Sequence, residues 1–178
     1  MAIGKGDVPP QKALADLEKH GRDGFRAVCS LLLVGHHHYR TWELLRVTYR
    51  PGEEKHLLEL AEETLPGYGT WSALEGLGVT KSKKARTYLL DRLAKEENSG
   101  LFMSAAQGLA HLGEKKAVPI VAEKLLSFER GWSGVERHLV TVLFRIGGKE
   151  ARRALEGYAK DERAKHADMA RRFLEQMK

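Results

Sequence analysis

A helical pattern that ends at a glycine and then begins again constrains the fold of this chain more than any other feature. Gly78, Gly113 and Gly147 each follow an apolar residue and stand 35 and 34 residues apart. Glycine just past a helix end adopts the left-handed conformation that other residues take only with strain. A period of this length predicts a stack of helical repeats.

The segments before and after these glycines have the period of an α-helix. Their apolar residues recur every three or four positions, so that each set lines one face of a helix. The sets are Leu101, Ala105, Leu109 and Leu112; Val135, Leu139, Val142, Leu143 and Ile146; and Ala151, Ala154, Leu155 and Tyr158. No segment of similar length alternates with period two, so we expect no sheet.

Weaker copies of the repeat precede these. The chain reads EEKHLLELAEETL after Gly52 and EKKAVPIVAEKLL after Gly113, and a fainter copy surrounds Gly21. We therefore expect helix pairs joined at Gly21, Gly52, Gly78, Gly113 and Gly147. The first helix of the third pair is expected to be short, over 70–77. One pair cannot bury its own apolar face, so several pairs must stack.

This pattern predicts a single all-α domain over residues 1–178. Residues 1–50 would form a divergent N-terminal repeat or cap, and residues 51–162 the clearer repeats. Residues 163–178 would form a C-terminal capping helix. The length of 178 residues is typical of one domain and is enough to bury a substantial core.

The string LGEKKAVPI at 112–120 resembles the turn between the two helices of bacterial HEAT-like repeats, the group that includes the phycobilin-lyase type. In that family a similar string opens the second helix of each pair, where proline is tolerated because the first turn needs no N–H. The resemblance covers roughly 50–178. It implies a right-handed α-solenoid of about five antiparallel helix pairs, with the second helices lining a concave surface that would carry the function.

Composition indicates an intracellular, soluble chain. The only cysteine, Cys29, lies in an apolar stretch and is expected to be a buried thiol, as suits a reducing compartment. The first ten residues lack the apolar core of a signal peptide, and no apolar run is long enough to cross a bilayer. We expect a cytoplasmic protein without membrane association.

The net charge of +6 is unevenly placed. Residues 1–70 carry 9 basic and 10 acidic residues, whereas residues 71–178 carry 21 and 14. The basic excess of the second part favours an acidic partner.

Basic residues cluster where the second helices are expected to begin. Stacking would align them into a stripe able to hold phosphates or an acidic protein surface. The cluster comprises Lys81, Lys83, Lys84, Arg86, Lys115, Lys116, Lys149, Arg152 and Arg153. Charged solvated faces are also ordinary on helices, and Glu114 and Glu150 interrupt the stripe. Both interpretations stay open.

The tryptophans Trp42, Trp71 and Trp132 are expected either to pack between repeats or to anchor a partner. Trp132 is the better candidate for partner binding, because Gly131 and Gly134 flank it in a glycine-rich turn. We therefore add Trp132 to the partner-binding residues, which otherwise are Lys81, Lys84, Arg86, Lys115, Lys116, Lys149, Arg152 and Arg153.

No catalytic residue, metal ligand or cofactor site is predicted. The histidines at 36–38 are adjacent, so their side chains would diverge on a helix, and the other histidines lack ligand spacing. Acidic pairs such as Glu53 and Glu54 are expected on solvated helix faces. The sequence contains no phosphate-binding loop or nucleophile elbow.

Three functions remain open at this point. A non-catalytic scaffold or adaptor would bind another protein, with an acidic surface, on the concave face. A nucleic-acid backbone binder, like the solenoids of DNA repair, would use the basic second part. An accessory subunit of lyase type is a further alternative, and the residues do not decide whether the chain is an enzyme.

Overall fold

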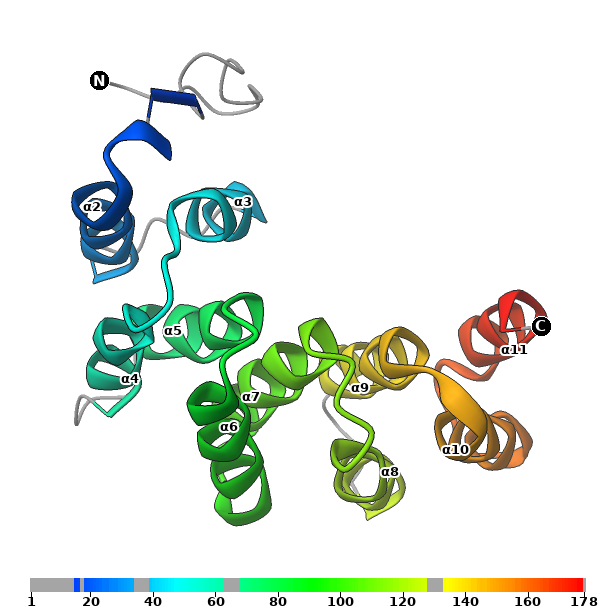
Figure 1. The fold of residues 1–178 in the computed structure, drawn as a ribbon. Helices are drawn as coiled ribbons and strands as arrows, with labels where there is room; N and C mark the ends of the chain where they lie inside the picture. The colour runs from blue at the N-terminus through cyan, green and yellow to red at the C-terminus, as the bar shows by residue number, and fades with distance from the viewer. Residues whose placement is uncertain (1–14, 17, 34–38, 63–67, 128–132, 178) are drawn as a thin grey trace. The chain divides into compact units, whose positions relative to one another are not determined.

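The computed structural model describes residues 15–16, 18–33, 39–62, 68–127 and 133–177. Across these ranges the regular structure is α-helical with no strand, so the all-α class is confirmed (Figure 1). No helix in this part of the chain is long and apolar enough to span a membrane. The helices are α2 (Gly21–Leu33), α3 (Tyr39–Thr48), α4 (Glu54–Glu62), α5 (Tyr68–Val79), α6 (Lys83–Lys95), α7 (Ser99–His111), α8 (Ala117–Ser127), α9 (Ser133–Ile146), α10 (Gly148–Lys160) and α11 (Ala167–Gln176).

The chain divides into two compact units, Met1–Ala85 and Arg86–Lys178. Helix α6 begins in the first unit and continues in the second. The single domain expected over 1–178 stays a prediction. Helix α11 lies within the segment 163–178 that was expected to be helical.

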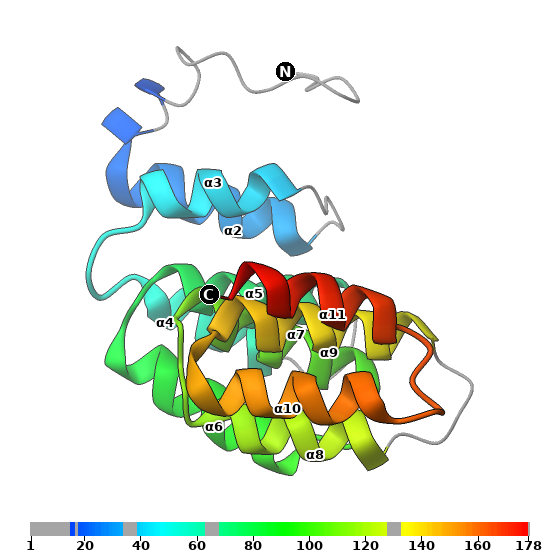
Figure 2. The same ribbon diagram turned by 90° about the vertical axis from the view of Figure 1, so that its right-hand side faces the viewer.

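In the second unit, the helices from α7 to α11 form two layers (Figure 2). Helix α9 contacts α7 and α11 in one layer, and α8 contacts α10 in the other. Helix α9 also contacts both α8 and α10, and its apolar residues Leu139, Val142 and Leu143 are fully buried. Each helix is therefore held by its neighbours in the chain and in its own layer, as the stacked pairs predict.

In the first unit, α2 contacts α3, α4 and α5, and α5 contacts α3 and α4. Helix α5 is longer than the expected 70–77, because its glycines belong to the helix. A Cβ at Gly76 would lie 2.8 Å from Cδ1 of Leu45 and 3.5 Å from Cδ1 of Leu57. The missing side chain thus lets α5 approach α3 and α4 closely, and glycine does not end the helix there.

A residue with positive φ stands at or shortly before the start of each of α2, α4, α6, α8 and α10. These residues are Gly21 (φ 47°), Gly52 (φ 95°), Lys81 (φ 52°), Gly113 (φ 62°) and Gly147 (φ 64°), and Gly148 (φ 88°) follows the last of them. The expected turn at Gly78 is therefore wrong: Gly78 is buried within α5, and Lys81 takes the left-handed conformation. Aligning the repeats on the buried alanines Ala85, Ala117 and Ala151, each four residues after the left-handed residue, gives the correct register.

Hydrogen bonds explain why the first helix of a pair ends at such a turn. Past α7, the N–H of Gly113 donates to the carbonyl of Ala110 at 3.1 Å, and the N–H of Glu114 donates to that of Leu109 at 3.0 Å. This is the Schellman arrangement, which satisfies carbonyls left without partners at a helix end. Past α9, the N–H of Gly147 donates to the carbonyl of Leu143 at 3.0 Å.

The same substitution should have opposite effects at two glycines of the second unit. A Cβ at Gly113 or at Gly157 would meet no atom within 4 Å, so only the backbone conformation differs. Gly113→Ala should lower the free energy of unfolding by about 1 kcal/mol, because alanine is strained at positive φ. Gly157→Ala should raise it by up to about 1 kcal/mol, because Gly157 is inside α10. Urea unfolding measures both, and equal signs would contradict the assigned turn.

Candidate functional site

The structure separates the basic residues at the turns into two groups. Arg86, Lys115 and Arg152 make contacts within the protein. Nε of Arg86 lies 3.1 Å from Oε2 of Glu114, and Nε of Arg152 lies 3.0 Å from Oε1 of Glu156. Arg152 also donates from Nη1 to the carbonyl of Met177 at 3.0 Å. These contacts account for the side chains without any partner molecule.

Lys115 connects two successive turns. Its Nζ donates to the carbonyl of Gly147 at 2.9 Å and to the carbonyl of Ile146. These carbonyls end α9, where a cation is favoured by the helix dipole and by free acceptors. Gly148 (φ 88°) makes room for the lysine, since a Cβ there would lie 3.3 Å from Nζ. Lys115 is therefore a structural residue.

Three arginines occupy one position of the repeat. Arg26, Arg86 and Arg152 each lie five residues after a left-handed turn residue. Arg26 and Arg86 face the glutamate that opens the following turn, at 4.0 Å for Arg26 and Glu53 and at 3.1 Å for Arg86 and Glu114. An arginine at this position therefore contacts the next repeat, which gives it a reason to recur without a ligand.

The remaining basic residues of the prediction are exposed. They are Lys81 and Lys84 in the first unit and Lys116, Lys149 and Arg153 in the second. Among the residues placed by the structure, none forms an ion pair with Lys116, Lys149 or Arg153. We name these three residues the turn patch.

The members of the turn patch lie close together. Lys115 contacts the carbonyls of Ile146 and Gly147, so the turn that carries Lys116 lies beside the turn before Lys149. Helices α8 and α10, which these two turns open, also contact each other. Arg153 follows Lys149 by four residues and shares its face of α10.

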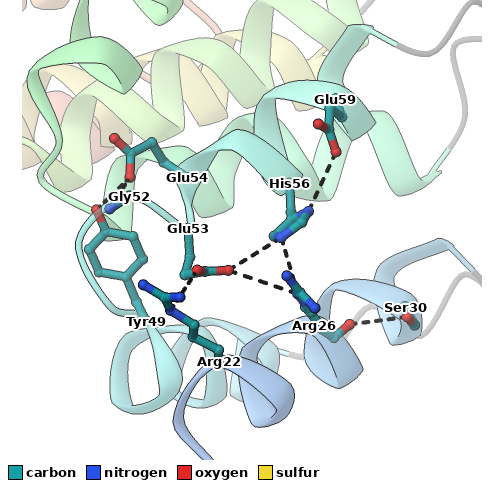
Figure 3. A network of polar contacts seen from close by, with 9 residues as sticks. All are labelled: Arg22, Arg26, Ser30, Tyr49, Gly52, Glu53, Glu54, His56 and Glu59. Carbon is teal, nitrogen blue, oxygen red and sulfur yellow. Dashed lines mark hydrogen bonds and ion pairs between the residues drawn. The ribbon is translucent and has the colours of Figure 1, made fainter.

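The carboxylates of Glu53 and Glu54 are buried, so the expectation that they lie on a solvated face is wrong (Figure 3). Oε1 of Glu53 lies 3.1 Å from Nε of Arg22, and Oε2 lies 3.2 Å from Nε2 of His56. Arg26 donates from Nε to Nε2 of His56 at 3.2 Å. The cluster joins α2 to the beginning of α4 and is explained by packing of these helices.

Glu54 is held by three donors. It accepts hydrogen bonds from the hydroxyl of Tyr49, the N–H of Gly52 and the hydroxyl of Ser82, each at 2.9 Å. Burial alone would raise the pKa of Glu54, but a hydrogen bond from its own backbone N–H, together with these three bonds, outweighs burial and holds the pKa below its usual 4.5. The nearby thiol of Cys29 is buried as expected, and burial together with Glu53 raises its pKa to about 12. A thiol with this pKa is not a nucleophile at neutral pH.

Other predicted residues are not informative for the site. Trp132 and the histidines at 36–38 lie outside the described residues, and Trp42 lies in α3 with an undescribed side chain. Trp71 is half-buried in α5. Within the ranges that the structure covers, no group of three or more histidine, cysteine or acidic side chains is placed to hold a metal.

A hollow of about 190 Å³ on α7 and α9 was not foreseen from the sequence. Its lining residues are Gln107, Gly134, Arg137, His138, Thr141 and Arg145. The signal was present: Arg137 and Arg145 stand eight residues apart in α9, on the side opposite Leu139 and Leu143. This pair of arginines lies away from the basic residues at the turns, in a helix that carries few other charges.

Two histidines beside this hollow have lowered pKa values. Burial is the main cause for both His111 and His138, and the positive charge of Arg145 adds to it. A hydrogen bond to the backbone of Met103 opposes the shift at His138 without cancelling it. Both imidazoles are therefore neutral at pH 7, beside arginines that stay charged.

Lys115→Met should destabilise the protein, and Lys116→Met should not. The first variant loses the bonds to the carbonyls that end α9, which should lower the free energy of unfolding by about 1 kcal/mol. The second removes the same charge from an exposed neighbour and should change it by less than about 0.5 kcal/mol. Chemical denaturation of both variants tests the assignment, and equal losses would contradict it.

Stability should fall as the pH is lowered from about 7 to about 5. The pKa of His138 is below 6.5 in the folded protein, so the unfolded chain binds more protons in this range and acid favours unfolding. The slope contributed by one histidine is at most about 1.4 kcal/mol per pH unit. His138→Gln should flatten the curve of unfolding free energy against pH. An unchanged slope would show that His138 titrates alike in both states.

No known protein family matches this chain, and no curated protein matches it significantly.

Proposed function

We propose that this protein is a non-catalytic interaction module, built as a right-handed HEAT-like solenoid, that binds an acidic surface of a partner protein through the turn patch. The observation that carries the proposal is that neighbouring lysines differ in the contacts their side chains make. Lys115 is bonded to the following turn, whereas the exposed side chains of Lys116, Lys149 and Arg153 form no ion pair with a residue that the structure places. The patch thus has charge that the fold does not use.

The HEAT-like architecture is supported by the contacts of the second unit. Helices α7 and α9 lie in one layer and α8 and α10 in the other, and a left-handed glycine precedes each of α8 and α10. Such repeats present rows of equivalent positions, so residues at one place in the repeat form a continuous surface. The members of the turn patch are not at equivalent positions, since Lys116 is three residues after Gly113, whereas Lys149 and Arg153 are two and six residues after Gly147. They come together because the two turns lie side by side.

A protein partner fits the patch better than a nucleic acid. Glu150 is exposed beside Lys149, and Glu156 lies one turn beyond Arg152 and pairs with it. A track for a polyanion gains from uninterrupted positive charge, because each neutralised phosphate releases counterions. Mixed charges of both signs are typical of surfaces that recognise one particular protein.

Charge reversal tests the proposal with a matched control. In the patch variant, Lys116, Lys149 and Arg153 are changed to glutamate. In the control variant, the exposed residues Lys160, Lys165 and Arg172 of the same unit are changed to glutamate. Both variants have the same change in net charge. Binding of a fluorescent glutamate-rich peptide and of a duplex DNA is measured by anisotropy across a salt series.

We expect the wild-type protein and the control variant to bind the peptide, and the patch variant to lose that binding. DNA should bind weakly. Equal peptide binding by all three proteins would contradict the role of the patch. DNA binding that exceeds peptide binding, falls steeply with salt and is lost in the patch variant would establish the nucleic-acid alternative instead.

A further inference from the structure

The hollow on α7 and α9 is made by one face of α9. Gly134, Arg137, His138, Thr141 and Arg145 recur at the spacing of successive helical turns. The opposite face of α9 is buried in the core. Gln107, which is 8% exposed, completes the hollow from α7.

The hollow contains positive charge without a carboxylate. None of its lining residues is acidic. Helix α7 contains no acidic or basic residue except His111 at its end, whose imidazole is neutral. The only acidic residue of α9 is Glu136, which is buried and accepts a hydrogen bond from the hydroxyl of Tyr158 at 2.7 Å. Glu136 is thus engaged with α10 and does not neutralise Arg137.

Both arginines are exposed and form no ion pair with a residue that the structure places. They differ in this from Arg86 and Arg152, whose guanidinium groups face carboxylates. Eight residues separate Arg137 from Arg145, about 12 Å along the helix, and both side chains line the hollow. Two cations held on either side of a concave surface attract an anion more strongly than scattered surface charges do.

A hydrogen-bonding group is also left unsatisfied beside the hollow. Nε2 of His138 is buried and makes no hydrogen bond to any residue placed in the structure. Because the neutral imidazole uses its other nitrogen for the bond to Met103, Nε2 is an acceptor, which a water molecule or the hydroxyl of a protonated phosphate can satisfy and a carboxylate cannot. Thr141 contributes no spare donor, because its hydroxyl donates to the carbonyl of Arg137 at 2.9 Å.

We propose that this hollow binds an oxyanion group, phosphate or carboxylate, between Arg137 and Arg145. The planar guanidinium presents paired N–H donors that match two oxygens of either group. The amide of Gln107 lies on the α7 side of the bound anion. The site is in the layer of α7 and α9, whereas the turn patch lies at the beginnings of α8 and α10, so this inference does not depend on the proposed function.

The test is a titration of the full-length protein with inorganic phosphate and, separately, with acetate. Amide chemical shifts are followed by NMR, with sodium chloride at matched ionic strength as the reference. The site variant carries Arg137→Gln and Arg145→Gln. The control variant carries Lys160→Gln and Lys165→Gln, which remove the same charge from exposed positions outside both the hollow and the turn patch.

We expect saturable shifts on α9 and at Gln107 in the wild-type and control proteins. The site variant should bind at least about tenfold more weakly, because two charge-assisted contacts are lost. Tighter binding of phosphate than acetate would identify a phosphorylated ligand, and the reverse a carboxylate ligand. Shifts that do not saturate, or that weaken equally in both variants, would overturn the proposal whatever the outcome for the turn patch.

Discussion

The left-handed turn before each second helix is the constraint on which the rest of this structure depends. It places a buried residue four positions later, Ala117 after Gly113 and Ala151 after Gly147. The second helix then begins in a fixed register, and the residues of the turn itself face the neighbouring turn. Lys115 bonds to the carbonyls at Gly147 because both turns have this geometry. Stacking thus follows from a backbone conformation that glycine adopts without strain.

This geometry also explains why neighbouring charges have different roles. Of two adjacent lysines in one turn, Lys115 reaches the next turn and Lys116 is exposed. Arginines five residues after the turn residue pair with glutamates, as Arg86 does with Glu114. Charge that the fold does not use remains in the turn patch and in the hollow of α9, and also at scattered exposed residues such as Lys84 and Lys160. The two sites lie in different helix layers, so one ligand need not compete with the other.

The sequence predicted the helical class, the helices near Gly113 and Gly147, and their buried faces, because helical period and glycine caps are local signals. The turn expected at Gly78 is wrong, because Gly78 is buried inside α5 and Gly76 allows close packing on Leu45 and Leu57, which are distant in the sequence. Glu53 was expected on a solvated face, because the arginines that approach it come from another helix. Arg137 and Arg145 were not predicted as a site, since a hollow arises only when α7 and α9 lie side by side.

Contacts between neighbouring helices, rather than one common core, hold the second unit together. Amide hydrogen exchange of the full chain, resolved by residue, tests this arrangement most directly. Helix α9 contacts α7, α8, α10 and α11, whereas α11 contacts only α9 and α10 among the helices of this unit. We therefore expect the amides of α9 to exchange slowest and those of α11 fastest. Equal protection of α9 and α11, lost in a single cooperative step, would contradict it.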